Sequence, residues 1–150
     1  MLALYQRDAR GGQGQVIDAA LYESIFNLTE SLLPEYSVFG VVREPAGAAL
    51  PGIAPSNAYL CKDGYVLIAG NGDGIFGRLM DRIGRPDIGG DLDLARNDGR
   101  ARRAAELDAA ISAWTEQRGI DEVLAAMREA GVPAGRIYSI ADISRDPHYR

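Results

Sequence analysis

The residues with the most specific spacing are Gly72-Asp73-Gly74-Ile75-Phe76-Gly77, which fit the dinucleotide-binding pattern G-x-G-x-x-G. The segment follows an expected strand and opens an expected helix, as a pyrophosphate-binding turn requires. Such a turn also needs a second parallel strand ending in an acid about 20 residues later, but residues 85–99 contain no apolar run. Asp73 would also compete with the pyrophosphate for the helix N-terminus. We therefore expect Asp73 to cap the helix, and no nucleotide site is predicted.

Nucleophilic catalysis would need a base close to a hydroxyl or a thiol. The candidate nucleophiles are Ser24, Ser31, Ser56 and Cys61. The single histidine, His148, is in the last three residues, and no G-x-S-x-G turn occurs. One cysteine and one histidine form no metal-ligand cluster, and the loops around Gly74 and Gly99 lack the end ligands of a calcium loop. The sequence thus predicts no catalytic residue and no metal site, and the lone cysteine indicates a reducing, cytoplasmic location.

The composition is that of a chain that can bury a core. Of its 150 residues, 47% are hydrophobic and 25% are charged, and the formal net charge is -5. A surface of this sign repels nucleic acids and anionic membranes, so neither is expected as a partner. The densest basic run, Arg100-Ala101-Arg102-Arg103, is interpreted as a solvated helix face.

Residues 1–56 predict a helix, a strand and a second helix, followed by a loop. Residues 1–5 enter an apolar, helix-compatible stretch without a capping residue, so the chain is expected to begin inside a helix. Gly11-Gly12 ends that helix, and Gln15-Val16-Ile17 predicts a short strand. An apolar stripe at helical spacing follows, made of Leu21, Ile25, Leu28 and Leu32. Between residues 34 and 56, prolines and glycines are too frequent for a regular element, which indicates a linker or functional loop.

Residues 57–145 predict a small α+β domain. Lys62-Asp63-Gly64 is a hairpin signal between the strand-like runs 58–61 and 65–69. Apolar stripes at helical spacing follow in residues 76–83, 104–114 and 120–127, the second ending on Trp114, which is expected in the core. A short strand at Arg136-Ile137-Tyr138 and a closing helical turn complete the order. Strands placed before helices, without alternation, favour the α+β class.

Several segments, taken in order, resemble the class III CoA-transferase family. They are G-Q-x-x-D followed by A-L-Y-E-S, then A-P-S-N-x-Y-x-x-K-D-G-Y-V-x-I-A-G-N, E-L-D-A-x-I-x-x-W-T, A-G-V-P-A-G-x-x-Y-S and D-P-H. Each motif by itself is common, but their shared order and spacing extend over nearly the whole chain. The family includes formyl-CoA transferase, carnitine CoA-transferase, the bile-acid-inducible type and α-methylacyl-CoA racemases.

The resemblance implies a parent subunit with a large Rossmann-like domain and a small α+β domain joined by two linkers. Two ring-shaped subunits would thread through each other as a homodimer. In this chain, residues 1–40 would be a helix-strand-helix remnant that closes the first segment of the large domain, and residues 41–56 a linker or loop. Residues 57–145 would be the small domain, with a hairpin and short strands packed against helices, and residues 146–150 would start the return linker.

The resemblance also implies a covalent mechanism. An Asp carboxylate attacks an acyl-CoA thioester, a mixed anhydride and then an aspartyl-CoA thioester form, and CoA passes to an acceptor carboxylic acid. Acyl-CoA and carboxylic acids would be the substrates, so coenzyme A is a substrate and no cofactor is implied. No residue of this chain matches the nucleophile, and Asp18 is expected to cap a helix at Ala19. The fragment alone is therefore expected to be inactive.

The predicted substrate-binding residues are Gly47, Gly52, Asn71 and Asp73. The loop A-G-A-A-L-P-G-I, residues 46–53, resembles the place where formyl-CoA transferases carry a mobile glycine-rich loop over the active site, although consecutive glycines are missing. Racemases of the family carry a Glu where this chain has Asn71-Gly72-Asp73. Because the His-containing segment of the racemases also lies outside this chain, Asp73 does not separate the two activities, and a transferase is favoured. The alternatives are a racemase of the same family and a non-catalytic, stand-alone small-domain module.

Overall fold

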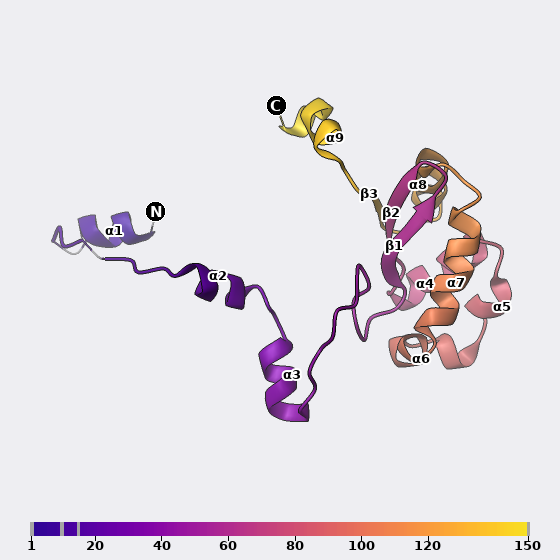
Figure 1. Ribbon diagram of the computed structural model, residues 1–150, viewed down its shortest axis with the longest axis horizontal. Helices are drawn as coiled ribbons and strands as arrows, with labels where there is room; N and C mark the ends of the chain where they lie inside the picture. Colours follow the sequence, from indigo (N-terminus) through magenta and orange to yellow (C-terminus); the bar gives the residue numbers. More distant parts are fainter. Residues whose placement is uncertain (1, 10, 15, 150) are drawn as a thin grey trace. The chain divides into compact units, whose positions relative to one another are not determined.

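The computed structural model describes residues 2–9, 11–14 and 16–149 (Figure 1). The chain divides into two compact units, residues 1–45 and residues 46–150. Among the described residues, no helix combines the length and the apolar character needed to cross a bilayer.

The first unit contains α1 (Leu2–Ala9), α2 (Leu21–Asn27) and α3 (Leu32–Phe39). The prediction of a strand at residues 15–17 is wrong over its described residues, because Val16 and Ile17 belong to a non-regular segment. Gln15, like the first residue of the chain, lies outside the described residues. A strand needs a neighbouring strand to bond its backbone N–H and C=O groups, and in this unit the described residues supply none.

The expected helix over residues 21–32 is interrupted in the structure. Glu30 has φ +50, a left-handed conformation that an α-helix does not contain. The following helix, α3, then continues to Phe39, although no regular element was expected after residue 34. Pro34 is tolerated because it occupies the first turn of α3, where its missing N–H would have no acceptor within the helix. Gly40, with φ +66, ends the helix.

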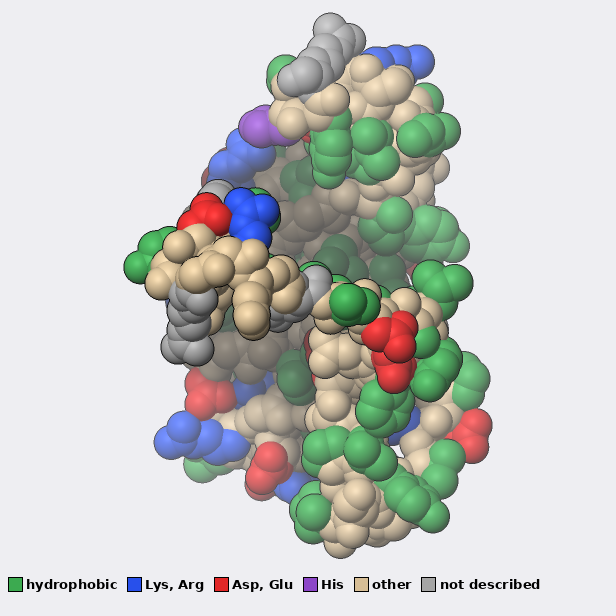
Figure 2. Space-filling view, turned by 90° about the vertical axis from the view of Figure 1, so that its left-hand side faces the viewer, with side chains coloured by type: hydrophobic (Ala, Val, Ile, Leu, Met, Phe, Trp, Pro, Cys, Tyr) green, Lys and Arg blue, Asp and Glu red, His purple; other side chains and the backbone are tan. Residues whose placement is uncertain are grey.

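Apolar side chains of the first unit are exposed to solvent. None of its described residues is buried, and the exposed ones include Leu21, Ile25 and Leu28 of the expected stripe. Figure 2 shows many hydrophobic side chains at the molecular surface. Local polar contacts hold this unit, such as the 2.7 Å hydrogen bond from Arg43 Nε to Glu35 Oε2.

The second unit is built on an antiparallel sheet that, among the described residues, has the order β1-β2-β3. The strands are β1 (Ser56–Cys61), β2 (Gly64–Ala69) and β3 (Ala134–Arg136). The predicted hairpin is confirmed, since Cys61 pairs with Gly64 across a two-residue turn. The third strand begins two residues earlier than predicted, because residues 134–136 pair with residues 66–68 of β2.

Helices α4 (Asp73–Arg82), α7 (Ala104–Thr115) and α8 (Ile120–Glu129) pack with the sheet to enclose the core. Helix α7 lies against β1, and α8 lies against β2 and β3 (Figure 1). The buried side chains include Tyr59, Val66, Ile68, Phe76, Leu79, Met80, Leu107, Ile111, Val123 and Met127. The three predicted stripes therefore face one core. Trp114 is only partly buried: it packs against this core, and the Arg118 guanidinium carbon lies 4.2 Å from its ring centroid.

The hairpin turn also fixes the start of α8. The Ile120 N–H donates a 2.8 Å hydrogen bond to Asp63 Oδ1, and the Lys62 N–H donates to the Arg118 carbonyl at 2.9 Å. Gly119, the residue before α8, has no side chain that could cap the helix. Asp63 therefore supplies from the hairpin an acceptor that a capping residue usually supplies locally.

The polar stretch 85–99 contains regular structure that the sequence pattern did not predict. It forms α5 (Pro86–Gly89), the 3₁₀ turn η1 (Leu92–Leu94) and the start of α6 (Asn97–Arg102). Ile88 and Leu94 from this stretch are buried. A Cβ added at Gly99 would lie 1.6 Å from the Asp93 carbonyl oxygen. Only glycine therefore lets the backbone of α6 approach η1 this closely.

The unit closes with α9 (Ile140–Arg145) and the 3₁₀ turn η2 (Pro147–Tyr149), in agreement with the expected closing helical turn. Ser139 caps α9, because its hydroxyl accepts a hydrogen bond from the Asp142 N–H at 3.2 Å.

We expect Gly99→Ala to lower the free energy of unfolding by about 3 kcal/mol or more, since its methyl group would collide with backbone rather than with a side chain that can move. Gly77→Ala is the matched control: Gly77 lies inside α4 with nothing within 4 Å of the added Cβ. It should raise stability by about 0.5 to 1 kcal/mol. Urea denaturation of both variants measures these changes, and equal stabilities would contradict the backbone contact at Gly99.

Candidate functional site

Arg100 is fully buried, which makes the interpretation of residues 100–103 as a solvated face wrong at this position. Its guanidinium donates hydrogen bonds to three backbone carbonyls: from Nε to Ala54 at 3.1 Å, from Nη1 to Leu94 at 2.9 Å and from Nη2 to Asn71 at 2.7 Å. Nη2 also donates to Asp73 Oδ1 at 2.8 Å. One side chain thus ties together the end of the 46–55 loop, η1 and the connection from β2 to α4.

The charge of this guanidinium is compensated from two directions. Asp73 supplies the counter-charge, and the Phe76 ring lies with its centroid 5.0 Å from the Arg100 guanidinium carbon. The second oxygen of Asp73 accepts from the exposed Arg96 at 3.0 Å. The hydrogen bond from Arg100, followed by lesser effects of Arg96, holds the pKa of the Asp73 carboxyl below its usual value. Asp73 is thus an ion-pair partner and not the predicted helix cap, since Gly72 occupies the capping position of α4.

Asn97, the first residue of α6, fixes the loop that precedes β1. Its Nδ2 donates to the Gly52 carbonyl at 2.8 Å, and its Oδ1 accepts from the Ala54 N–H at 3.2 Å. The amide therefore bonds the backbone on both sides of residue 53. Because Ala54 also accepts from Arg100, two residues of α6 hold the same end of the loop.

The structure brings three of the four predicted substrate-binding residues around α6. Gly52 is bound by Asn97, whereas Asn71 and Asp73 are bound by Arg100. Gly47 lies in a turn of the same loop, with φ +65. Among the described residues, no hydrogen bond joins Gly47 to α6. Helix α6 therefore binds the end of the loop at Gly52 and Ala54, and within the part of the chain that the structure describes it makes no such bond to the end at Gly47.

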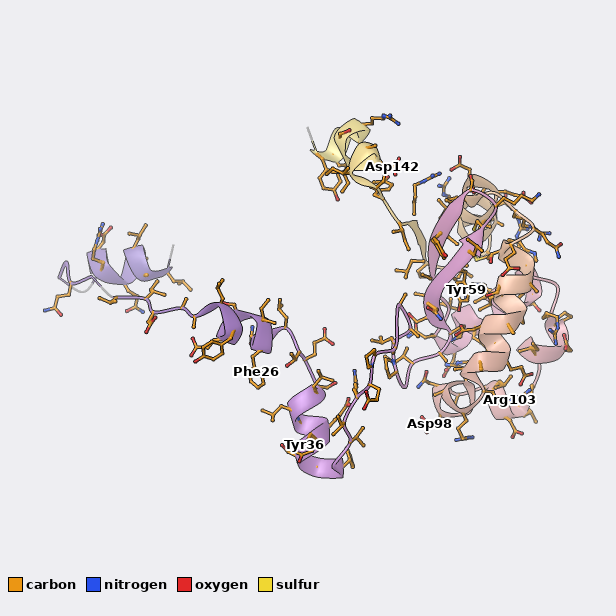
Figure 3. All side chains as sticks on the ribbon, viewed as in Figure 1. Phe26, Tyr36, Tyr59, Asp98, Arg103 and Asp142 are labelled. Atoms are coloured by element: carbon orange, nitrogen blue, oxygen red, sulfur yellow. The ribbon has the colours of Figure 1, made fainter. Side chains whose placement is uncertain are left out.

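A cavity of about 250 Å³ lies beneath this loop. Most of residues 46–56 form one wall, and Ala101, Ala104 and Asp108 form the other. Asp108 is the acidic residue of this lining. Both of its oxygens accept hydrogen bonds, one from the Tyr59 hydroxyl at 2.6 Å and one from Asn57 Nδ2 at 3.0 Å. Tyr59 belongs to β1, and its side chain reaches Asp108 of α7 (Figure 3). Burial, reinforced by Asp108, raises the pKa of Tyr59, so it stays protonated and donates to Asp108.

Of the candidate nucleophiles, Ser31 donates a 2.8 Å hydrogen bond to Glu35 Oε1, but Arg43 binds the same carboxylate and holds the pKa of Glu35 below its usual value, which makes it a weak base. Cys61 is buried, and burial, with a lesser effect of Asp63, raises the pKa of its thiol. The exposed His148 ring contacts Asp146, with 2.7 Å between Nδ1 and Oδ1. No group of three or more His, Cys, Asp or Glu residues in the described part of the chain could hold a metal ion.

Asp18 does not cap α2 as expected. The helix begins at Leu21, two residues later than predicted, and Ala20 occupies the capping position. The Ala20 N–H instead donates to Glu23 Oε2 at 3.2 Å, which is the reverse half of a capping box.

The sequence pattern missed Asn97 and Arg100, the residues that assemble this site. Both lie in the segment N-D-G-R, and the signal that marks them is the glycine inside a short helix. Glycine is unfavourable there unless another backbone comes close, and a close backbone supplies the carbonyls that a buried arginine needs.

We expect Asp73→Asn to lower stability at pH 7, and the loss to shrink as the pH falls. The pKa of the Asp73 carboxyl is lower in the folded chain than in the unfolded chain, so its stabilisation is fully present above about pH 4 and disappears as the pH falls through the folded value. Below that value Asp73 is neutral, like asparagine. Urea denaturation between pH 7 and pH 3 tests this, with the exposed Asp98→Asn as control (Figure 3). A difference that does not change with pH would refute the role of the charge.

Comparisons with known proteins place these observations in a family. The model of CoA-transferase family III matches residues 1–150. Succinyl-CoA–D-citramalate CoA-transferase of Chloroflexus aurantiacus is 44% identical over 150 residues, which cover 99% of this chain and 37% of that protein. Succinyl-CoA:mesaconate CoA-transferase of Haloarcula marismortui is 34% identical over 149 residues, with the same coverage of 99% and 37%. The chain thus spans little more than a third of the length of these relatives.

Solved structures share the fold. A CAIB/BAIF family protein from Brucella suis is 36% identical, with a TM-score of 0.73 over 97% of this chain and 38% of that chain. A Mycobacterium tuberculosis protein has a TM-score of 0.78 at 23% identity, over 99% of this chain and 38% of that one, and supports the fold alone. The predicted α+β class is confirmed, and so is the resemblance inferred from the ordered motifs. The chain belongs to CoA-transferase family III.

Proposed function

We propose that the protein containing this chain transfers CoA from succinyl-CoA to a dicarboxylic acid. The observation that carries the proposal is the 44% identity, along the whole chain, to a relative named for succinyl-CoA and D-citramalate. Other relatives at 33% and 34% identity are named for L-malate and mesaconate. The acceptors in these names are acids with two carboxylates, and the donor is succinyl-CoA in each.

The mechanism proposed for this protein is covalent. An Asp carboxylate attacks the thioester, and CoA passes through an aspartyl-CoA thioester to the acceptor carboxylate. We place that nucleophile outside these 150 residues, since no residue here matches it. Coenzyme A enters as part of the substrate, and no further cofactor is required.

The contribution of this chain is the surface that faces the substrates. In the proposal, the backbone of the loop around Gly47 and Gly52 covers the reacting thioester, and the segment with Asn71 and Asp73 lies beside it. The cavity under the loop and the bonds from α6 to Gly52, Asn71 and Asp73 support a shared role for these two segments.

The ion pairs of Asp73 argue against the racemase alternative. A racemase moves a proton at the carbon next to the thioester, and its acid-base groups work best with pKa values near the working pH. Asp73 is bound to Arg96 and Arg100, which hold the pKa of its carboxyl below the usual value. Both of its oxygens are engaged by arginines, which leaves this carboxylate poorly placed to exchange a proton with substrate at the position where racemases carry a Glu.

The assembly proposed for the parent protein is a cytoplasmic homodimer of interlocked subunits. The relatives named for L-malate have an alpha and a beta subunit, each 33% identical to this chain, so a pair of related chains is the alternative assembly. Sedimentation of the full-length protein expressed alone distinguishes the two.

The full-length protein should form the CoA ester of a dicarboxylic acid from succinyl-CoA. Chromatography of CoA esters after incubation with D-citramalate, L-malate or mesaconate measures this, and a bile acid serves as the monocarboxylic comparison. Absence of transfer to every acid would refute the proposal. Exchange of the 2-hydrogen of a 2-methylacyl-CoA into deuterated water, without transfer, would establish a racemase instead.

The 150-residue chain alone should show no transfer, because a covalent route cannot start without its nucleophile. Incubation with succinyl-CoA followed by hydroxylamine and mass spectrometry tests this, with the full-length protein as positive control. A hydroxylamine-sensitive adduct on the chain would place a nucleophile among these residues.

A further inference from the structure

We propose that Asn97 and Arg100 are positioning residues that hold the 46–55 loop so that it keeps water away from the covalent intermediate. The proposal rests on the proposed transferase function. It assigns a role to α6, which contributes none of the predicted substrate-binding residues.

The loop passes from exposed to buried at the point where α6 binds it. Residues 46–48 and 50–53 are exposed, whereas Ala54 is 3% exposed. In the exposed half, the Ala49 N–H donates to the Ala46 carbonyl at 3.3 Å, which is a contact within the loop itself. At the buried end, Asn97 and Arg100 bond both polar groups of the Ala54 backbone. Backbone bonds also join Leu50 to Ser56 and Pro55 to Gly70, so α6 supplies the side-chain bonds that fix this end of the loop.

An asparagine suits this position because its amide carries a donor and an acceptor side by side. The donor binds the Gly52 carbonyl and the acceptor binds the Ala54 N–H. An aspartate has the same shape but cannot donate, so it would face the Gly52 carbonyl with a second oxygen. The substitution therefore removes the bond to Gly52 without removing volume, and it adds one negative charge.

Arg100 extends the same constraint to the second predicted segment. Its guanidinium bonds the Ala54 carbonyl on the loop side and the Asn71 carbonyl and Asp73 on the other. A displacement of either segment would leave an acceptor or the buried charge without its partner, which is costly. The two segments are therefore held in one fixed relation.

Water competes with the acceptor acid for the aspartyl-CoA thioester. When water attacks, a C–O bond forms and the C–S bond breaks, which returns the Asp carboxylate and releases CoA as the thiol, with one proton going to sulfur and one to solvent. When the acceptor carboxylate attacks, a C–O bond forms and the C–S bond breaks, which gives a mixed anhydride and the CoA thiolate. The thiolate then forms a C–S bond to the acceptor carbonyl, and the anhydride C–O bond breaks to release the Asp carboxylate. A well-placed loop excludes water and favours the second route.

The test compares Asn97→Asp with the wild type in the full-length protein. Succinyl-CoA and an acceptor acid are incubated together, and free CoA and the new CoA ester are measured in the same reaction. We expect the ratio of hydrolysis to transfer to rise by about three- to tenfold, the factor that corresponds to losing one hydrogen bond. Asp98→Asn, the same chemical change reversed at the exposed neighbour, should leave the ratio unchanged.

A merely structural role of Asn97 would give a different result. Loss of folded enzyme lowers hydrolysis and transfer in proportion, so an unchanged ratio overturns the proposal. Asn97→Ala, which removes both bonds, replaces Asn97→Asp if that variant does not fold.

Hydrogen exchange of peptides from residues 46–56 in the same full-length variants gives a readout independent of activity. Faster exchange in Asn97→Asp supports the positioning role, and unchanged exchange overturns it. If the wild type transfers CoA to no acid, the proposed function fails and the water-excluding role fails with it, while the exchange result still decides whether Asn97 positions the loop.

Discussion

The buried guanidinium of Arg100 is the constraint on which the arrangement of the second unit depends. A charge removed from water is tolerated only when it is paired and its donors are satisfied. Here the acceptors come from Ala54, Asn71 and Leu94, and the counter-charge from Asp73. These groups belong to separate stretches of chain. The stretches must therefore keep their relative positions for every donor of Arg100 to have its acceptor. Gly99 permits that placement, because α6 could not otherwise reach η1.

The parts of the fold that the sequence predicted are those specified by local patterns. The hairpin around Asp63 and the stripes of α4, α7 and α8 follow from turn chemistry and from helical spacing, which need no knowledge of distant residues. The strand expected at residues 16–17 depends on a partner strand, and the described part of its unit has none. The helix expected through residues 28–31 is interrupted at Glu30, whose backbone conformation the apolar spacing does not encode.

The candidate site also contains some residues that the sequence could identify and others that it could not. Gly52, Asn71 and Asp73 could be singled out through the family resemblance, and their contact with substrate stays a prediction. That one arginine joins them could not be predicted, because a run with several arginines usually forms a solvated surface. Burial of Arg100 is set by carbonyls up to 46 residues away in the chain. The role of Asn97 could not be predicted for the same reason, because its partners Gly52 and Ala54 are 45 and 43 residues away along the chain.

The hydrogen bond between Asp63 and the Ile120 N–H couples the stability of α8 to that of the hairpin. Helix α8 receives this acceptor from a residue 57 positions earlier, because Gly119 before the helix has no side chain that could supply it. An isolated helix of this length is marginal in water. The hairpin, in contrast, closes over a two-residue turn and can form early. The hairpin tip and the first turn of α8 therefore share one bond, and local opening of either is expected to loosen the other.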